Sequence, residues 1–381
     1  MKFLSLEEFQ DLFKSANDLV SYPDFKKNAV VVVGNTSTPL TIYMDKKNIT
    51  ENDIQLLFEN IRNKNDYLSR FYTLSLRTPL DRIHFHNIIE PMPVSRMDNN
   101  QKTVYKNLIR NIHYNQILHN TTSGLENNRS YLNMLFDLYK EHKIDYKILT
   151  PSAIFYMKEN RLGSVFSSYY FRASIMNPFL VYSLNQSLLH GTKVFTPTLG
   201  WSSYAYGLLE CPTVTEYVGT DVIPDVCKKT EYLIASLREN IKHEILCVPS
   251  ENLLKSDVFK SKYKNHFDLV FFSPPYYRLE LYEGDHQSTT LYKTYDEWLS
   301  KYWEETIKLA HYVLCNGGKL CYIISGYGSK NTKRVYDLIT DLNAITIKYF
   351  ANLECNIPMH NKDVHVTKHK ETSERIIVFT K

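Results

Sequence analysis

Residues 267–277, FDLVFFSPPYY, decide the fold of this chain. The first six are almost continuously apolar, which is typical of a strand buried on both faces of a parallel sheet. Pro274 and Pro275 then fix the backbone and supply no N–H groups, so they form a stiff turn. Because ligands of open α/β sheets bind beyond the carboxyl ends of the strands, residues 273–276 are predicted to lie in a functional site.

Apolar strand-like runs alternate with helical patterns from about residue 165 onward, and this alternation predicts a parallel sheet. The predicted strands are residues 193–196, 216–220, 244–248, 267–272 and 319–324. Two further runs, 345–353 and 375–380, follow with no helix between them and predict an antiparallel hairpin. The expected fold is therefore α/β and Rossmann-like, with a mostly parallel seven-stranded sheet closed by a C-terminal hairpin.

The N-terminal region has a different texture. Ser5 with Glu8, and Thr50 with Asp53, form capping-box patterns that predict the starts of two helices. Further expected elements are a strand pair, 29–33 with 40–43, and helices at 101–118 and 131–141. We therefore expect an α-rich domain over residues 1–150, assigned to target recognition by elimination, and a second domain over residues 165–381.

Composition excludes several classes of protein. The net charge of +4 gives no overall positive field, so any nucleic-acid contact must come from local patches. No cysteine pair has metal-ligand spacing, so no metal site is expected and the thiols suit a reducing compartment. The N-terminus lacks a signal-peptide pattern, and no uncharged apolar run reaches the ~18 residues that span a bilayer. We expect a soluble, intracellular protein.

The proline turn suits one particular chemistry. An amino group attached to a nucleic-acid base is a poor nucleophile, because its lone pair is delocalised into the ring. The Ser273 side chain and the Pro274 carbonyl could accept its two hydrogens and favour a pyramidal nitrogen. Tyr276 could stack on the base, which must first be swung out of a duplex. The alternative is a purely structural turn after a buried strand.

Residues 273–276 resemble motif IV, (D/N/S)-P-P-(Y/F/W), of the S-adenosylmethionine-dependent DNA amino-methyltransferases, which make N6-methyladenine or N4-methylcytosine. Residues 194–210, VFTPTLGWSSYAYGLLE, and 216–221, EYVGTD, are similar to the cofactor motifs of that family. The resemblance covers about residues 165–381. It implies that the catalytic residues are Ser273, Pro274, Pro275 and Tyr276. It implies that S-adenosylmethionine is bound by Phe171, Pro197, Thr198, Gly200, Trp201, Asp221, Ser250 and Glu251.

The chain departs from this pattern at three positions. Thr196 replaces the leading acid of the family, Ser202 its second glycine and Tyr204 its arginine. A serine is compatible with the glycine turn if its φ is negative, but the lost acid removes a partner of the cofactor's ammonium group. Asp221, expected to accept the ribose hydroxyls, has the alternative role of a helix N-cap. A catalytically silent subunit therefore stays an open interpretation.

Nucleic acid, DNA in the first place, is the expected partner. Lys102, Lys106, Arg110 and His113 share one predicted helix face, which is either a phosphate contact or an ordinary solvated face. The candidate nucleic-acid contacts are Lys102, Lys106, Arg110, Tyr277, Gln287, Lys368 and Lys370. The loop after the catalytic turn, which contains Glu280, Glu283 and Gln287, resembles one branch of the family.

The sequence thus predicts direct methyl transfer to adenine N6 or cytosine N4, with base flipping. No cysteine follows a proline in the manner of a carbon-5 methylation nucleophile, because Cys211 precedes Pro212. Methylation of RNA or of a protein glutamine is the competing enzymatic interpretation. The sequence leaves the target site and the oligomeric state open.

Overall fold

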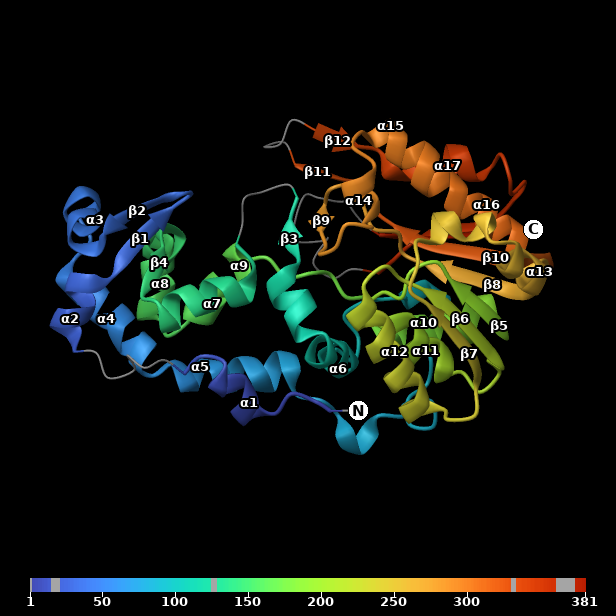
Figure 1. Cartoon of the computed structure of the whole chain (residues 1–381). Coiled ribbons are helices and arrows are strands. Elements are labelled where there is room, and N and C mark those ends of the chain that lie inside the picture. The colour runs from blue at the N-terminus through green and yellow to red at the C-terminus, as the bar shows by residue number, and fades with distance from the viewer. Residues whose placement is uncertain (1, 15–20, 125–128, 330–333, 361–373) are drawn as a thin grey trace. The chain divides into compact units, whose positions relative to one another are not determined.

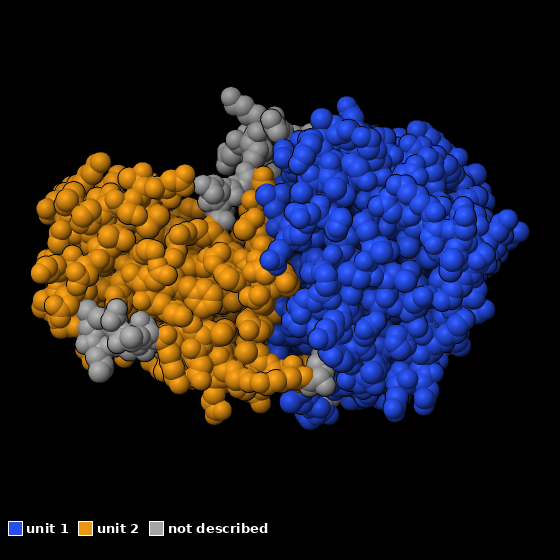
Figure 2. Space-filling view, in the orientation of Figure 1, with its two compact units in different colours: residues 1, 78–113, 174–381 blue, residues 2–77, 114–173 orange. Residues whose placement is uncertain are grey.

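The structure is a computed structural model that describes residues 2–14, 21–124, 129–329, 334–360 and 374–381 (Figure 1). It contains two compact units, each of which is formed by two segments of the chain (Figure 2). Unit 1 consists mainly of Thr78–His113 and Ser174–Lys381, and unit 2 consists of Lys2–Arg77 and Tyr114–Ala173.

This division differs from the predicted boundary between residues 150 and 165, because Thr78–His113 packs with the C-terminal part of the chain. The ring of Phe85 contacts Tyr182 and Tyr206 at centroid distances of 5.2 and 5.4 Å. The buried carboxylate of Glu210 accepts hydrogen bonds from the N–H of Phe85 and from the imidazoles of two neighbouring histidines. These contacts tie the segment to unit 1.

Unit 1 is built on a seven-stranded sheet of order β13-β14-β10-β8-β5-β6-β7. Its strands are β5 (Lys193–Thr196), β6 (Glu216–Thr220), β7 (Lys242–Leu246), β8 (Phe267–Phe272), β10 (Leu314–Ile324), β13 (Asn352–Pro358) and β14 (Arg375–Thr380). The pairings among β7, β6, β5, β8 and β10 are parallel, whereas β14 is antiparallel to both β10 and β13. This confirms the predicted Rossmann-like fold, with a mostly parallel seven-stranded sheet and a C-terminal antiparallel hairpin.

Helices cover the sheet on both faces, which explains why the central strands are apolar along their whole length. Every residue of β6 is buried, as are all but one of β8. Figure 1 shows α10 to α12 on one face and α16 and α17 on the other. The helices of unit 1 are α6 (Val104–Ile112), α10 (Pro178–Leu184), α11 (Ser203–Leu209), α12 (Pro224–Leu237), α13 (Asp257–Tyr263), α14 (Ser288–Leu291), α15 (Tyr295–Trp298), α16 (Glu304–Val313) and α17 (Leu338–Thr346). Short strands are β9 (Glu280–Leu281), β11 (Tyr327–Ser329) and β12 (Arg334–Tyr336).

The strand order places a switch point beside β5. From β5 the chain continues into β6 on one side, and it later enters β8 on the other side. Loops that leave the carboxyl ends of β5 and β8 therefore diverge and leave a crevice between them, where ligands of such folds bind.

Unit 2 is rich in helices and has a small sheet of order β2-β1-β4. Its strands are β1 (Val30–Val33), β2 (Thr36–Pro39) and β4 (Lys143–Asp145), with a short β3 (Thr122–Ser123). Its α-helices are α1 (Leu6–Asp11), α2 (Tyr22–Asn28), α3 (Leu40–Lys47), α4 (Glu51–Arg62), α5 (Lys64–Phe71), α7 (Tyr131–Lys140), α8 (Pro151–Lys158) and α9 (Leu162–Tyr169). Both predicted capping boxes are present, at the starts of α1 and α4.

Three predicted elements are wrong. Residues 40–43 begin helix α3 instead of a strand, because Leu40, Tyr43 and Met44 bury one helical face and the partner of β1 is already supplied by β2. Residues 345–353 contain the end of α17 and only the start of β13. The predicted helix 101–118 is interrupted after Ile112, and a π-helical turn follows at Gln116–Asn120.

No helix within the described ranges combines the length and the apolar character needed to cross a bilayer.

Candidate active site

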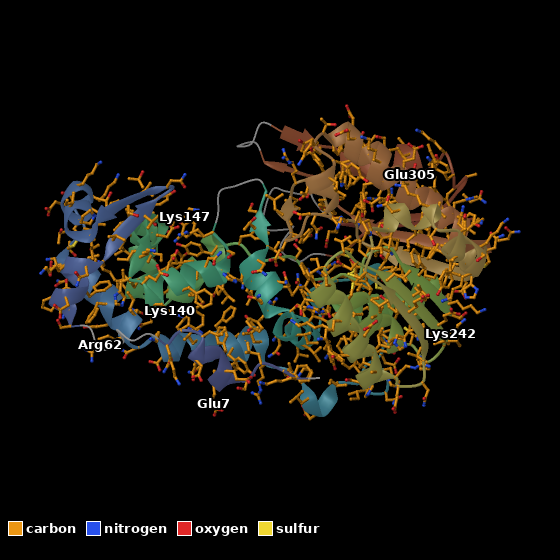
Figure 3. All side chains as sticks on the ribbon, in the orientation of Figure 1. Glu7, Arg62, Lys140, Lys147, Lys242 and Glu305 are labelled. Atoms are coloured by element: carbon orange, nitrogen blue, oxygen red, sulfur yellow. The ribbon has the colours of Figure 1, made fainter. Side chains whose placement is uncertain are left out.

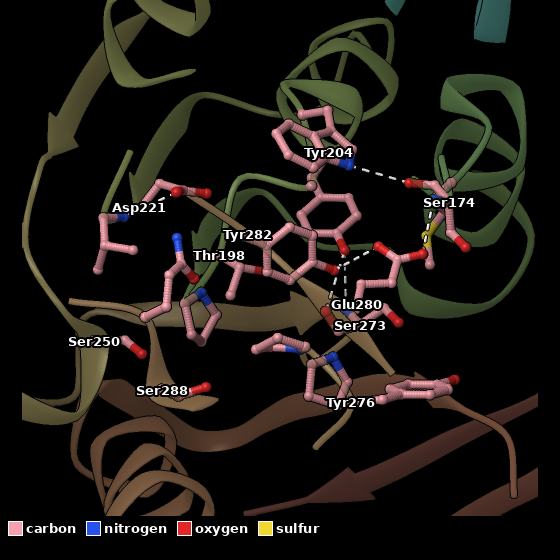
Figure 4. A pocket seen from close by; sticks show the side chains of 18 of the residues that line it. Ser174, Thr198, Tyr204, Asp221, Ser250, Ser273, Tyr276, Glu280, Tyr282 and Ser288 are labelled. Carbon is pink, nitrogen blue, oxygen red and sulfur yellow. Dashed lines mark hydrogen bonds between the residues drawn. The ribbon is translucent and has the colours of Figure 1, made fainter. Parts of the chain in front are cut away.

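A cavity of about 430 Å³ lies in unit 1 where the carboxyl ends of β5, β6, β7 and β8 meet (Figure 4). All four predicted catalytic residues line it. So do seven of the eight predicted cofactor residues: Pro197, Thr198, Gly200, Trp201, Asp221, Ser250 and Glu251. The eighth, Phe171, belongs to unit 2. The fold thus gathers residues that are up to 79 positions apart, from 197 to 276, around one space.

The hydroxyl hydrogen of Ser273 is already used in a hydrogen bond within the protein. It donates to the carbonyl of Ile323 in β10 over 2.9 Å, so its lone pairs are what it can offer to a ligand. The carbonyl of Pro274 receives no hydrogen bond from the described part of the chain. The turn therefore presents two acceptors, as the sequence predicts.

The ring of Tyr276 is held at its hydroxyl. The N–H of Ser325, which follows β10, donates to Tyr276 Oη over 2.7 Å. Burial raises the pKa of this phenol, so Tyr276 stays neutral. The fixed ring forms part of the cavity wall, as a stacking surface would (Figure 4).

Tyr204, which the sequence shows only as a departure from the family pattern, holds the predicted catalytic turn. The N–H of Ser273 donates to Tyr204 Oη over 3.1 Å, and the same hydroxyl lies 3.4 Å from the Ser273 carbonyl (Figure 4). Burial raises the pKa of Tyr204 to about 12. An added Cβ on Gly200 would lie 2.3 Å from Tyr204 Cζ. The space that Gly200 leaves is therefore filled by this ring rather than left open for a ligand.

The turn after β5 is left-handed at three consecutive residues. Gly200, Trp201 and Ser202 have φ angles of 53°, 59° and 68°. Ser202 therefore does not have the negative φ expected of a serine at the glycine position, and each non-glycine residue here costs roughly 1–2 kcal/mol. Such strain persists only where surrounding contacts impose it.

Side-chain hydrogen bonds hold this strained turn. Trp201 Nε1 donates to the carbonyl of Ser174 over 3.1 Å. Ser202 Oγ lies 2.8 Å from His113 Nε2 and 2.7 Å from Thr230 Oγ1. His113 is fully buried, and burial lowers its pKa to about 3, so it is a neutral partner of Ser202. The prediction that His113 belongs to an exposed basic face is therefore wrong.

Asp221 follows β6 directly and lines the cavity. Its Oδ1 accepts from the N–H groups of Val222 and Ile223, and its Oδ2 accepts only one long bond, of 3.3 Å, from Leu199 N. Burial raises the pKa of Asp221 despite these three N–H donors. The N-cap of α12 is Ile223, so the alternative role of Asp221 as the N-cap is wrong. Oδ2 keeps capacity for a ligand hydroxyl.

The cavity is strongly acidic. Four carboxylates line it, and no lysine or arginine among the described residues does. Glu280 accepts from the N–H of Ser174 over 2.9 Å and from the hydroxyl of Tyr282 over 2.7 Å. Burial raises the pKa of all four carboxyl groups, those of Asp221, Glu251, Glu280 and Glu374. The sequence signal for Glu280 was its place in the loop after the catalytic turn, and Glu374 had no signal.

The predicted nucleic-acid contacts differ in their exposure to solvent. Tyr277 is 2% exposed and donates to the carbonyl of Lys293, so its assignment to nucleic-acid contact is wrong. Gln287 is buried and lines the active-site cavity. Lys102 is exposed, whereas Lys106 is half-buried and its pKa is lowered to about 8 by burial. Arg110 is half-buried and donates to Asn107. Lys368 and Lys370 lie outside the described residues.

No protein-family model matches the sequence, and no curated protein matches it. Solved structures with a similar fold include the N-methyltransferase NodS from Bradyrhizobium japonicum WM9 in complex with S-adenosyl-L-homocysteine, with 11% identity, coverage of 53% of this chain and 82% of that one, and a TM-score of 0.34. TrmN from Thermus thermophilus has 16% identity, coverage of 54% and 49%, and a TM-score of 0.35. SMU.776 complexed with SAH has 10% identity, coverage of 56% and 52%, and a TM-score of 0.36. At such identities and TM-scores, the likeness carries no argument about the reaction or substrate of this chain.

Proposed function

We propose that this chain transfers a methyl group from S-adenosylmethionine to an exocyclic amino group of a nucleic-acid base, adenine N6 or cytosine N4, in DNA. One observation carries the proposal: a rigid turn with two available acceptors, Ser273 Oγ and Pro274 O, faces an acidic cavity at the switch point of a Rossmann-like sheet.

The charge of the cavity supports this choice of cofactor. A nicotinamide or flavin dinucleotide would bring a pyrophosphate among four carboxylates, with no lysine or arginine in the described lining to offset the repulsion. A cofactor with a sulfonium and an ammonium group suits the same surroundings. When bound, S-adenosylmethionine supplies an electrophilic methyl group on a positively charged sulfur.

Particular residues would hold the cofactor. Asp221 Oδ2 is available to a ribose hydroxyl, in the position that acidic residues occupy in Rossmann sites. Glu280 is a carboxylate in the lining without an ion-pair partner among the described residues, and it can replace the family acid in whose place this chain has Thr196. Ser250 and Glu251, which follow β7 and which the resemblance assigns to cofactor binding, also line the cavity.

The chain's own residues prepare the amino nitrogen. Ser273 Oγ and Pro274 O each accept one N–H hydrogen, which draws the nitrogen out of conjugation and directs its lone pair into the cavity. Tyr276 supports the face of the base, and its anchor at Ser325 keeps the ring in place. The methyl group that the bound cofactor supplies would be transferred to this nitrogen, which would then release one proton to solvent. No covalent bond to the protein is needed.

Incubation with labelled cofactor and with duplex DNA, single-stranded DNA and RNA tests the proposal. Ser273→Ala and Tyr276→Ala should each lower label incorporation by roughly 100-fold, because each removes a contact to the reacting group. The matched controls are Ser236→Ala and Tyr232→Ala on the exposed side of α12, which should leave it unchanged. Equal incorporation by all five proteins would contradict the catalytic assignment. Mass spectrometry of the product separates N6-methyladenine from N4-methylcytosine, and both from a methylated protein glutamine.

A catalytically silent nucleic-acid-binding subunit is the second candidate. It is favoured by the ring of Tyr204, which fills the space beside Gly200, and by the strained backbone of Ser202. Calorimetry with S-adenosylmethionine discriminates between the two. Binding at micromolar concentration supports the enzyme, whereas no heat at millimolar concentration, with the fold intact, supports the silent subunit.

A further inference from the structure

Unit 2 contains a second cavity, of about 690 Å³, whose chemistry is the reverse of that of the active site. It lies among α4, α5, the turn that follows α5, and α9. Three arginines line it together with two carboxylates, Glu59 and Asp66, both of which are exposed. Neutral polar groups complete the lining: Asn60, Asn63, Ser75, Asn160, Ser164, Ser167 and Ser168.

The three arginines, Arg70, Arg161 and Arg172, have no carboxylate partner within the described parts of the chain. Aromatic rings support two of them instead. The guanidinium of Arg161 lies 5.0 Å from the ring centre of Tyr156, and that of Arg172 lies 5.1 Å from Tyr131. Such contacts orient a guanidinium without neutralising it, so its N–H groups stay available.

The wall around Arg172 is tightly built. The hydroxyls of Tyr67 and Tyr131 are hydrogen-bonded to each other, and burial raises the pKa of Tyr67. An added Cβ on Gly163 would lie 2.9 Å from the Tyr67 ring, so α9 approaches α5 closely at this point.

We propose that this cavity binds phosphate groups of a polynucleotide backbone. The planar fork of arginine matches phosphate oxygens in pairs, and serine and asparagine side chains add neutral donors of the kind common in backbone contacts. The choice of a polynucleotide rests on the proposed function, whereas anion binding rests on the cavity alone. Unit 2 thereby gains a role that does not depend on reading bases.

The test uses the full chain and fluorescently labelled single-stranded DNA, duplex DNA and RNA of one sequence, titrated at several salt concentrations. A triple variant, Arg70→Gln with Arg161→Gln and Arg172→Gln, should weaken binding by at least about 10-fold and reduce the slope of log affinity against log salt by roughly two to three. Arg62→Gln is the matched control. Arg62, which is labelled in Figure 3, is another exposed arginine of unit 2 that lies over an aromatic ring. It is not among the residues that line the cavity, and its replacement should change neither quantity.

Two further measurements distinguish arginine-specific contacts from a general effect of charge and from a loss of folding. A triple arginine-to-lysine variant retains charge, so partial recovery of the salt slope with incomplete recovery of affinity supports arginine-specific contacts. Unchanged affinity and slope in the glutamine triple variant, with circular dichroism showing an intact fold, would overturn the inference. So would binding of inorganic phosphate in the cavity with no effect of the variant on polynucleotides. If the wild type binds polynucleotide through these arginines but transfers no methyl group, the proposed function fails and this site stands.

Discussion

The backbone N–H of Ser273 donates a hydrogen bond to the hydroxyl of Tyr204 over 3.1 Å. The contact joins the first helix after β5 to the predicted catalytic turn after β8, across the switch point of the sheet. Tyr204 stands where the resembling family has arginine, so this chain uses a neutral, buried phenol to fix the position of its proline turn. A positioning residue of this kind acts through Ser273.

Tyr204→Phe should separate positioning from binding. Removal of the hydroxyl leaves the N–H of Ser273 without its partner, so the turn loosens and kcat falls by about 10-fold while KM for the nucleic acid changes little. The control is Tyr217→Phe, which removes another buried hydroxyl, bonded to Thr196 Oγ1 over 2.8 Å and not to the turn. Steady-state kinetics measure both variants. An equal loss of kcat in the two would mean that general destabilisation, rather than positioning, is the cause.

Gly200→Ala should be severely destabilising, because φ is 53° and the new methyl group would lie 2.3 Å from Tyr204 Cζ. We expect a loss of more than about 2 kcal/mol in the free energy of unfolding. The double variant with Tyr204→Ala removes the clash but keeps the positive φ, so it should show a positive coupling of about 1 kcal/mol or more in a double-mutant cycle. Additive losses in denaturant unfolding would show that Tyr204 does not occupy that space.

Substitution of Ser202 by glycine and by alanine isolates the cost of the left-handed backbone. Both remove the hydroxyl that bonds His113 and Thr230, but only glycine relaxes the strain at φ 68°. Ser202→Ala should therefore be less stable than Ser202→Gly by about 1 kcal/mol in urea unfolding. The same pair of substitutions at Ser236, in the last turn of helix α12, should not reproduce this order, because Ser236 is helical and glycine is the poorer helix former. Identical stabilities for the two Ser202 variants would argue against the left-handed turn.

The sequence predicted the parts of the site that follow directly from local pattern. The apolar run that ends in two prolines marks the end of β8 in the sequence itself. Asp221 likewise comes directly after the apolar run that forms β6. The roles of Tyr204 and Glu280 depend instead on partners far along the chain. Tyr204 meets Ser273 across 69 residues, and Glu280 meets Ser174 across 106. No sequence periodicity predicts these two contacts, because they form only when loops that are distant in the chain meet at one edge of the sheet.

The incorrectly predicted helices and strands also reflect contacts that form only in the folded protein. Residues 40–43 have a β-branched and aromatic composition that favours a strand, but burial of Leu40, Tyr43 and Met44 on one face of α3 outweighs this preference. Residues 345–353 likewise read as a strand, yet Leu338, Leu342 and Thr346 of α17 are buried at helical spacing. Burial in the folded protein decides whether such a short apolar run forms a helix or a strand, because its intrinsic preference for either is small.

The acidic cavity predicts how stability and cofactor affinity vary with pH. Burial raises the pKa of Glu280 above its ordinary value of 4.5. A carboxyl group whose pKa is raised by folding contributes stability that is fully present below the unfolded pKa and is lost as the pH rises through the folded pKa. The cofactor-free protein should therefore lose stability as the pH rises from near 4.5 through the raised pKa of Glu280. Affinity for S-adenosylmethionine should increase over the same window, because the ionised carboxylates attract its cationic groups.

Glu280→Gln assigns part of this behaviour to one residue. The variant should be more stable than the wild type at pH values above the raised pKa of Glu280, because no charge is buried, yet it should bind S-adenosylmethionine at least about 10-fold more weakly there. Glu239→Gln, on the exposed surface after α12, is the control and should follow the wild type in both respects. Thermal unfolding and calorimetry at a series of pH values provide the two readouts. Because Asp221, Glu251 and Glu374 also have raised pKa values, the slope with pH should shrink in Glu280→Gln without vanishing. A variant that retains wild-type affinity and wild-type slope would remove Glu280 from the cofactor site while leaving the catalytic turn untouched.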